Sequence, residues 1–203
     1  MTAHSPDRFT GYTTTLMPLL EELCGLAEDI HRKAHPTEGG PDDPMSIMCR
    51  ANQIRSRIQS WQWDSKSGVS EASVERLVAH AHAYRAAALL MLFRLLYPAG
   101  SSVESDQRAL EMAGEVMIYL RGPPEDLRLS AWPALIASCE LQSEEDRVVA
   151  INIFRSIYGV RKTGTSLQTL KFVTDRVWRA RDEGYDWNWM TLSQQFPGEC
   201  VPI

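Results

Sequence analysis

The chain has 203 residues, a formal net charge of −5 and 44% hydrophobic residues, which fits one globular domain with a sizeable core. So acidic a chain lacks the broad cationic surface that neutralises phosphates, and we expect it not to bind nucleic acid directly. The longest apolar run, residues 86–93, is far shorter than the ~20 residues of a membrane helix. These features exclude a membrane-spanning or DNA-binding role for the chain alone.

The four cysteines, Cys24, Cys49, Cys139 and Cys200, are dispersed and include no C-x-x-C pair. This pattern is typical of reduced thiols and gives no zinc ligand set. We therefore expect an intracellular protein, nuclear or cytoplasmic, without a metal or other cofactor.

In the first half of the chain, apolar residues recur at helical spacing and predict three helices. The first covers about residues 16–32, with Thr15 as its N-cap and Pro18 in its first turn. The second runs from Pro44 to Trp61 and is capped by Asp43. The third runs from about residue 73 to 97. It is almost continuously apolar between residues 86 and 96, which favours a central helix packed on every side.

The second half predicts four more helices and a terminal turn. The fourth helix starts after Ser102 and carries a buried stripe that includes Met117. The others span about residues 129–141, with Ser130 as cap, 143–159, ending at Gly159, and 165–184, opened by Thr165 and ended by Gly184; the turn begins at Asp186. The chain is therefore predicted to be all-α, a single array of about seven helices in one domain over residues 1–203, with residues 1–14 flexible.

Several motifs follow one another in a characteristic order in the last third of the chain. They are Ser130-Ala131-Trp132-Pro133, Cys139, Glu145-Asp146-Arg147, Val177-Trp178 and the segment from Asp182 to Trp187. This order resembles the C-terminal regulatory region of fungal-specific transcription factors of the zinc-binuclear-cluster type, to which sterol-sensing regulators belong. We expect the matching motif residues to be structural: Pro133, Cys139, Asp146, Arg147, Gly184, Asp186 and Trp187.

The DNA-reading zinc cluster of that family needs six closely spaced cysteines, and the four dispersed cysteines of this chain do not supply them. The chain is thus similar to the back half of a regulator. It could be a fragment or a stand-alone gene product.

Motifs that could carry chemistry are weak. Residues 159–166 come within one residue of a phosphate-binding loop, but Thr165 stands where the lysine is needed. Glu28, His31 and His35 share a helix face without the second Glu-x-x-His of a di-iron bundle. His80 and His82 point in different directions on a helix. No catalytic residue is assigned.

Aromatic and methionine side chains could line an apolar cavity. Sterol-sensing relatives bind their ligand inside the regulatory region, so the resemblance implies a pocket for a small hydrophobic molecule. The candidate pocket residues are Trp61, Tyr84, Phe93, Tyr97, Met117, Trp132 and Trp178, with Trp63, Trp187, Met91 and Met112 as further members of the set.

Two hypotheses follow. The first is an effector-responsive regulatory domain, acting in transcription regulation and secondary metabolism, that binds partner proteins or a second copy of itself. The alternative is a stand-alone descendant that binds a hydrophobic metabolite or acts on it as a cofactor-free cyclase or isomerase, by positioning and desolvation alone.

Overall fold

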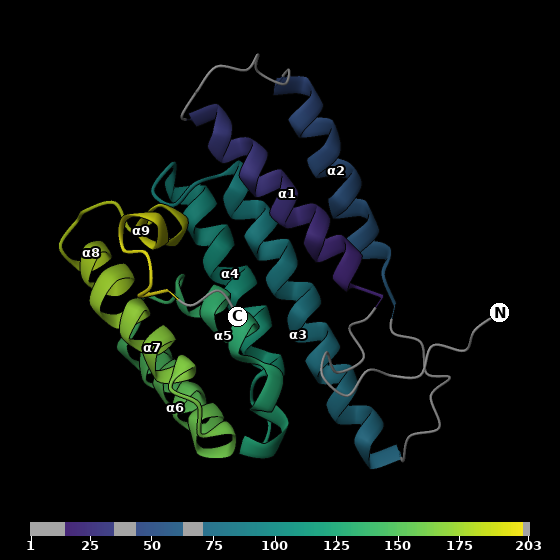
Figure 1. The fold of residues 1–203 in the computed structure, drawn as a ribbon, viewed down its shortest axis with the longest axis vertical. Coiled ribbons are helices and arrows are strands. Elements are labelled where there is room, and N and C mark those ends of the chain that lie inside the picture. The colour runs from purple at the N-terminus through teal and green to yellow at the C-terminus, as the bar shows by residue number, and fades with distance from the viewer. Residues whose placement is uncertain (1–14, 35–43, 63–70, 201–203) are drawn as a thin grey trace.

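The computed structural model describes residues 15–34, 44–62 and 71–200. The predictions for Asp43, His35, Trp63 and residues 1–14 lie outside these ranges. Within them every regular element is a helix, which confirms the all-α prediction (Figure 1). The α-helices are α1 Met17–Ala34, α2 Pro44–Ser60, α3 Glu71–Leu96, α4 Val103–Tyr119, α5 Ala131–Ser138, α6 Glu144–Arg161, α7 Thr165–Phe172, α8 Arg179–Asp182 and α9 Trp189–Gln195.

More α-helices are present than the seven expected because a π turn separates α8 from α7 and because the terminal segment forms α9. A 3-10 helix, η1 (Pro124–Leu129), precedes α5, so the predicted helix over residues 129–141 begins later and ends earlier. A π-helical turn, η2 (Val173–Trp178), joins α7 to α8. The expected helix from residue 165 to 184 is therefore one rod with a π turn in its middle.

Helix α3, with 26 residues, is the longest element and touches α1, α2, α4, α5 and η1. In Figure 1, α1 and α2 lie on one side of it, α4 and α5 on the other, and α6 to α8 stand beyond α5. The core side chains of α3, such as Leu90 and Leu92, are almost fully buried.

The expected packing of α3 on every side is not confirmed. Four apolar residues between positions 86 and 96 are only partly buried: Ala86, Leu89, Phe93 and Leu96. They follow one another at spacings of three and four, so they form a strip along one face of the helix. Helices α2 and α4 contact α3 on either flank of this strip and leave it accessible.

Two predicted helix starts are confirmed. The Ser102 hydroxyl accepts a hydrogen bond from the Ser105 N–H at 3.1 Å and caps α4. The Ser143 hydroxyl accepts one from the Asp146 N–H, also at 3.1 Å, and caps α6. The Asp146 carboxylate turns back as expected, but it accepts from the Ser143 hydroxyl at 2.7 Å. Asp146 thus completes the cap through a side-chain pair.

Two other predicted helix ends are displaced, and one predicted capping bond is absent. Helix α6 passes through Gly159 and ends at Arg161, and its C-cap Lys162 adopts the left-handed conformation at φ 56°. Thr165 lies inside α7, whose N-cap is Gly164 without a side-chain bond. Ser130 occupies the N-cap position of α5 without making a capping bond. Before α1, the Thr15 hydroxyl accepts from the Trp61 indole N–H at 2.9 Å, and its role as the N-cap of α1 stays a prediction.

Gly184 ends the last long rod as predicted. It has φ 76°, a conformation that glycine adopts without steric cost. The N–H of Tyr185 donates to the Ala180 carbonyl at 2.8 Å and that of Gly184 to the Arg181 carbonyl at 3.1 Å. This pair of bonds is the Schellman motif, and it turns the chain toward Trp187.

Candidate functional site

A groove of about 450 Å³ opens between α2, α3 and α4. Its floor is the half-buried strip of α3 formed by Ala86, Leu89, Phe93 and Leu96, defined above. The volume lies within the range of small-molecule sites in proteins, which combine apolar surface with a few polar groups. The groove is therefore a candidate ligand site.

The walls of the groove come from α4 and α2. Helix α4 presents Arg108, Met112, Glu115 and Tyr119 at alternating spacings of four and three, which place them on one face. Helix α2 contributes Arg55 and Gln59, one turn apart. Polar groups thus border an apolar floor.

Aromatic contacts mark the length of the groove. The rings of Phe93 and Tyr97 lie with centroids 4.9 Å apart. Further along α3, the His82 ring stacks on Tyr119 of α4, with centroids 5.3 Å apart. Partial burial, with a contribution from the charge of Arg85, lowers the pKa of His82. An imidazole whose pKa lies below 6.5 is mostly uncharged near neutral pH.

Arg85 joins the groove to the end of α2. Its Nε donates to the Ile58 carbonyl at 2.9 Å, and its Nη2 donates to the Gln59 carbonyl. These carbonyls lie in the last turn of α2, where the helix dipole favours a cation. Arg85 therefore fixes the position of α2 against α3 while lining the groove.

Two of the seven predicted pocket residues, Phe93 and Tyr97, line this groove, and so does Met112. The other five lie elsewhere. Tyr84 stacks on Trp132, with ring centroids 5.4 Å apart, and its hydroxyl donates to the Leu129 carbonyl. Burial raises the pKa of Tyr84 to about 12. This pair binds α3 to the start of α5.

The remaining three predicted pocket residues also make packing contacts away from the groove. The Trp178 indole is 5% exposed and donates to the Ser138 carbonyl at 2.7 Å. Met117 belongs to the core of α4, and Trp61 bonds to Thr15. Met91 is buried as well.

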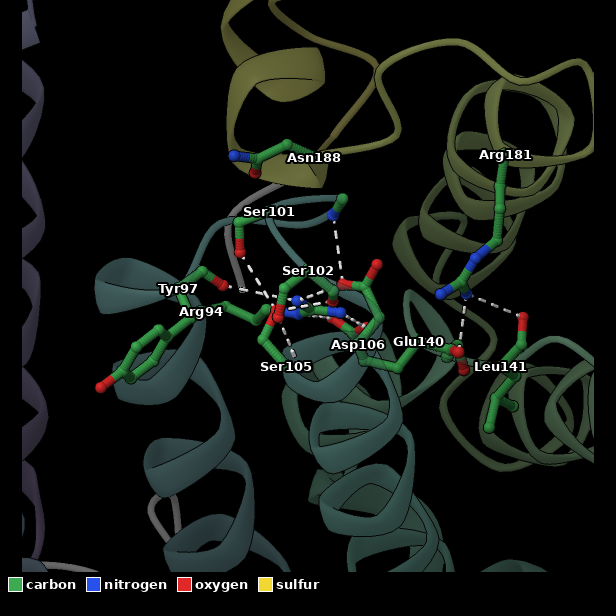
Figure 2. Close-up of polar contacts among 12 residues, drawn as sticks. Arg94, Tyr97, Ser101, Ser102, Ser105, Asp106, Glu140, Leu141, Arg181 and Asn188 are labelled. Carbon is green, nitrogen blue, oxygen red and sulfur yellow. Dashed lines mark hydrogen bonds and ion pairs between the residues drawn. The ribbon is translucent and has the colours of Figure 1, made fainter.

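A buried arginine, Arg94, reaches from α3 to Asp106 of α4 and to Glu140 (Figure 2). The Arg94 side chain is 2% exposed and that of Glu140 is 1% exposed. Arg94 Nε and Nη2 donate to the two carboxylate oxygens of Glu140 at 2.9 and 2.6 Å. Arg94 Nη1 donates to Asp106 Oδ1 at 2.7 Å. A bidentate pair of this kind satisfies most of the buried polar atoms.

The charges in this cluster support one another. Burial alone would lower the pKa of Arg94, but hydrogen bonds and charge from Glu140 and Asp106 raise it above its ordinary value. The Asp106 carboxylate also accepts from the Gly100 N–H at 3.1 Å, which closes the turn between α3 and α4. Arg94 thus links α3 to α4 and to Glu140, which follows α5.

The cluster extends to α8. Arg181 Nη1 donates to the Glu140 carbonyl at 2.7 Å, as Figure 2 shows. Both guanidinium groups lie against the Trp187 ring, Arg181 at 3.5 Å and Arg94 at 5.0 Å from its centroid. We call Arg94, Asp106, Glu140, Arg181 and Trp187 the buried arginine cluster.

The other motif residues are buried or make local polar contacts. Pro133 is buried in the first turn of α5. Cys139 is fully buried, and burial raises its thiol pKa well above the ordinary value. Arg147 makes a bidentate pair with Asp182, both distances being 2.7 Å, and lies over the Trp178 ring. The Asp186 carboxylate accepts from the Asn188 N–H at 2.9 Å.

The sequence analysis did not single out Arg94 or Glu140. The signal was a single charge inside each of two apolar segments, since buried arginine and glutamate are rare unless paired. Within the described ranges, no three or more His, Cys, Asp or Glu side chains are placed to hold a metal ion. A membrane-crossing helix is also absent from that part of the chain.

Comparison with protein families matches residues 1–197 to the fungal specific transcription factor domain. The chain belongs to this family. The match confirms the resemblance seen in the order of the Trp-Pro, Asp-Arg and Val-Trp motifs. No curated protein and no solved structure matches the chain. Membership of the fungal specific transcription factor domain family supports a regulatory role.

Proposed function

We propose that this chain is the effector-responsive part of a fungal transcription factor, and that a small hydrophobic molecule bound in the groove between α2, α3 and α4 shifts its conformation. The observation that carries the proposal is the groove of about 450 Å³ whose floor is apolar. Burying that floor under a ligand removes apolar surface from water, which favours binding.

The two faces of α3 offer a route from the groove to the rest of the domain. Phe93 lines the groove, and Arg94, the next residue, points into the buried arginine cluster. Tyr97 lines the groove, and its carbonyl accepts from Arg94 Nη1 at 3.4 Å. A ligand that moves this end of α3 would therefore alter contacts to α4 and α8. Such a ligand shifts the equilibrium between two conformations of the domain only if it binds them with different affinity.

DNA contacts would come from another part of the regulator or from a partner subunit, since the 203 residues hold only four dispersed cysteines and a net charge of −5. The domain would act in the nucleus, or reach it from the cytoplasm, as a homodimer or with other proteins. Exposed apolar side chains such as Val103 and Ile118, 81% and 60% exposed, could contribute to such contacts.

The test is a thermal-shift screen of the purified chain against sterols, terpenoids, polyketides and fatty acids, repeated with Ala86→Trp. Ala86 lies half-buried on the groove floor, so an indole at this position fills the groove from within. A ligand that raises Tm in the wild type but not in this variant supports the proposal. Equal shifts in both, or no shift with any class, would contradict it.

A further inference from the structure

We infer that the groove between α2, α3 and α4 selects an amphipathic anion, a molecule with an apolar chain and a carboxylate head that binds at Arg55 and Arg85. This inference rests on the proposed function and names the chemistry of its ligand. It follows from the charge of the groove, which differs in sign from that of the whole chain. Three arginines and one glutamate line the groove, whereas the net charge of the chain is −5.

Arg55 and Arg85 lie at the same part of the groove. Arg85 donates to the carbonyl of Gln59, and Arg55 is one helical turn before Gln59 on the same face of α2. Neither guanidinium pairs with a carboxylate among the residues that the structure describes. Arg55 Nη2 donates to the neutral Asn52 side chain at 2.6 Å. Two cations that pair with no carboxylate in the described part of the chain therefore border the apolar floor.

The third arginine is different, because Arg108 already forms an ion pair with Glu111 at 2.9 Å. Glu115, on the same wall, adds a negative charge near that side of the groove. An anionic head is thus favoured beside α2, and the apolar chain of the ligand would lie along Leu89 and Phe93. Hydrogen bonds from guanidinium to carboxylate are stronger than those between neutral groups, so the head should add clearly to affinity.

The experiment compares dodecanoate with dodecanol, which have the same chain but differ in charge. We expect the purified 203-residue chain to bind dodecanoate at least about tenfold more tightly at pH 7, measured by isothermal titration calorimetry below the micelle concentration. Arg55→Gln should weaken dodecanoate binding about tenfold and leave dodecanol unchanged, and Arg55→Lys should restore part of the loss. Arg155→Gln, an exposed arginine on α6, is the matched control and should have no effect.

The outcomes separate this inference from the proposed function. Equal binding of acid and alcohol, or an Arg55→Gln variant that binds dodecanoate like the wild type, would overturn the anionic selectivity and leave a neutral effector in the groove. If Ala86→Trp abolishes binding of both compounds, the site is the groove. If neither compound binds the wild type, the inference fails. If sterols or terpenoids then raise the Tm of the wild type but not that of Ala86→Trp, the groove nevertheless holds an effector, and the proposed function stands.

Discussion

Replacing Arg94 with methionine removes the cation that holds the buried Glu140 carboxylate. Arg94→Met should reduce the free energy of unfolding by about 3–5 kcal/mol, because removal of one partner leaves an uncompensated buried charge. The size of the effect follows from the 2% and 1% exposure of the two side chains. Urea unfolding followed by tryptophan fluorescence gives the value directly.

Two variants separate burial from charge. Arg179 pairs with Glu183 at 2.8 Å on the surface, with the two side chains 70% and 46% exposed, so Arg179→Met should cost less than about 1 kcal/mol. The double variant Arg94→Met/Glu140→Met should recover much of the stability lost in Arg94→Met, since an apolar pair of similar volume needs no compensating charge. An Arg94→Met loss below about 1 kcal/mol would refute the view that this pair is buried and unhydrated.

Three further predictions concern packing, protonation and backbone conformation. Trp178→Ala should cost about 3–5 kcal/mol because it leaves a large void, and Trp178→Phe less; an unchanged Tm by calorimetry would mean that the indole is not packed against Ser138. Burial lowers the pKa of His80 from 6.5 to about 4. As pH falls, the unfolded chain therefore binds the proton before the folded chain does. The free energy of unfolding should decrease by on the order of 3 kcal/mol as the pH falls through the range between these two pKa values. His80→Gln should flatten that profile in urea titrations at pH 5 and 7, and an unchanged slope would show that other groups cause it. Lys162→Gly should raise the unfolding free energy by up to about 1 kcal/mol by relieving φ 56°, whereas a loss in urea unfolding would mean that the contact of Lys162 with Tyr158 matters more.

Local sequence signals predicted most of the helices, since capping and glycine rules depend on neighbours only. Ser102 and Ser143 begin their helices, and Gly184 ends one, through bonds to residues close in sequence. The prediction that Gly159 ends α6 was wrong. The helix continues through Gly159, and Lys162 takes the left-handed conformation that ends it. The π turn at residues 173–178 gave no sequence signal.

The candidate site could be predicted only in part. An apolar helix face looks the same in sequence whether another helix or an open groove lies beside it. Phe93 and Tyr97 were identified because they are aromatic, but the strip that includes Leu89 was taken as core. The pair of Arg94 with Glu140 joins residues 46 positions apart, and sequence spacing gives no information on such a contact.

Hydrogen–deuterium exchange of the purified chain, with and without the tightest ligand from the thermal-shift screen, tests the central claim most directly. The account predicts slower exchange in peptides that cover residues 82–97 and 108–119, which line the groove. It also predicts altered exchange near Glu140 and Arg181, and neither change in Ala86→Trp. Protection confined to other helices, or the same pattern in Ala86→Trp, would contradict a ligand-responsive groove coupled through α3 to the buried arginine cluster.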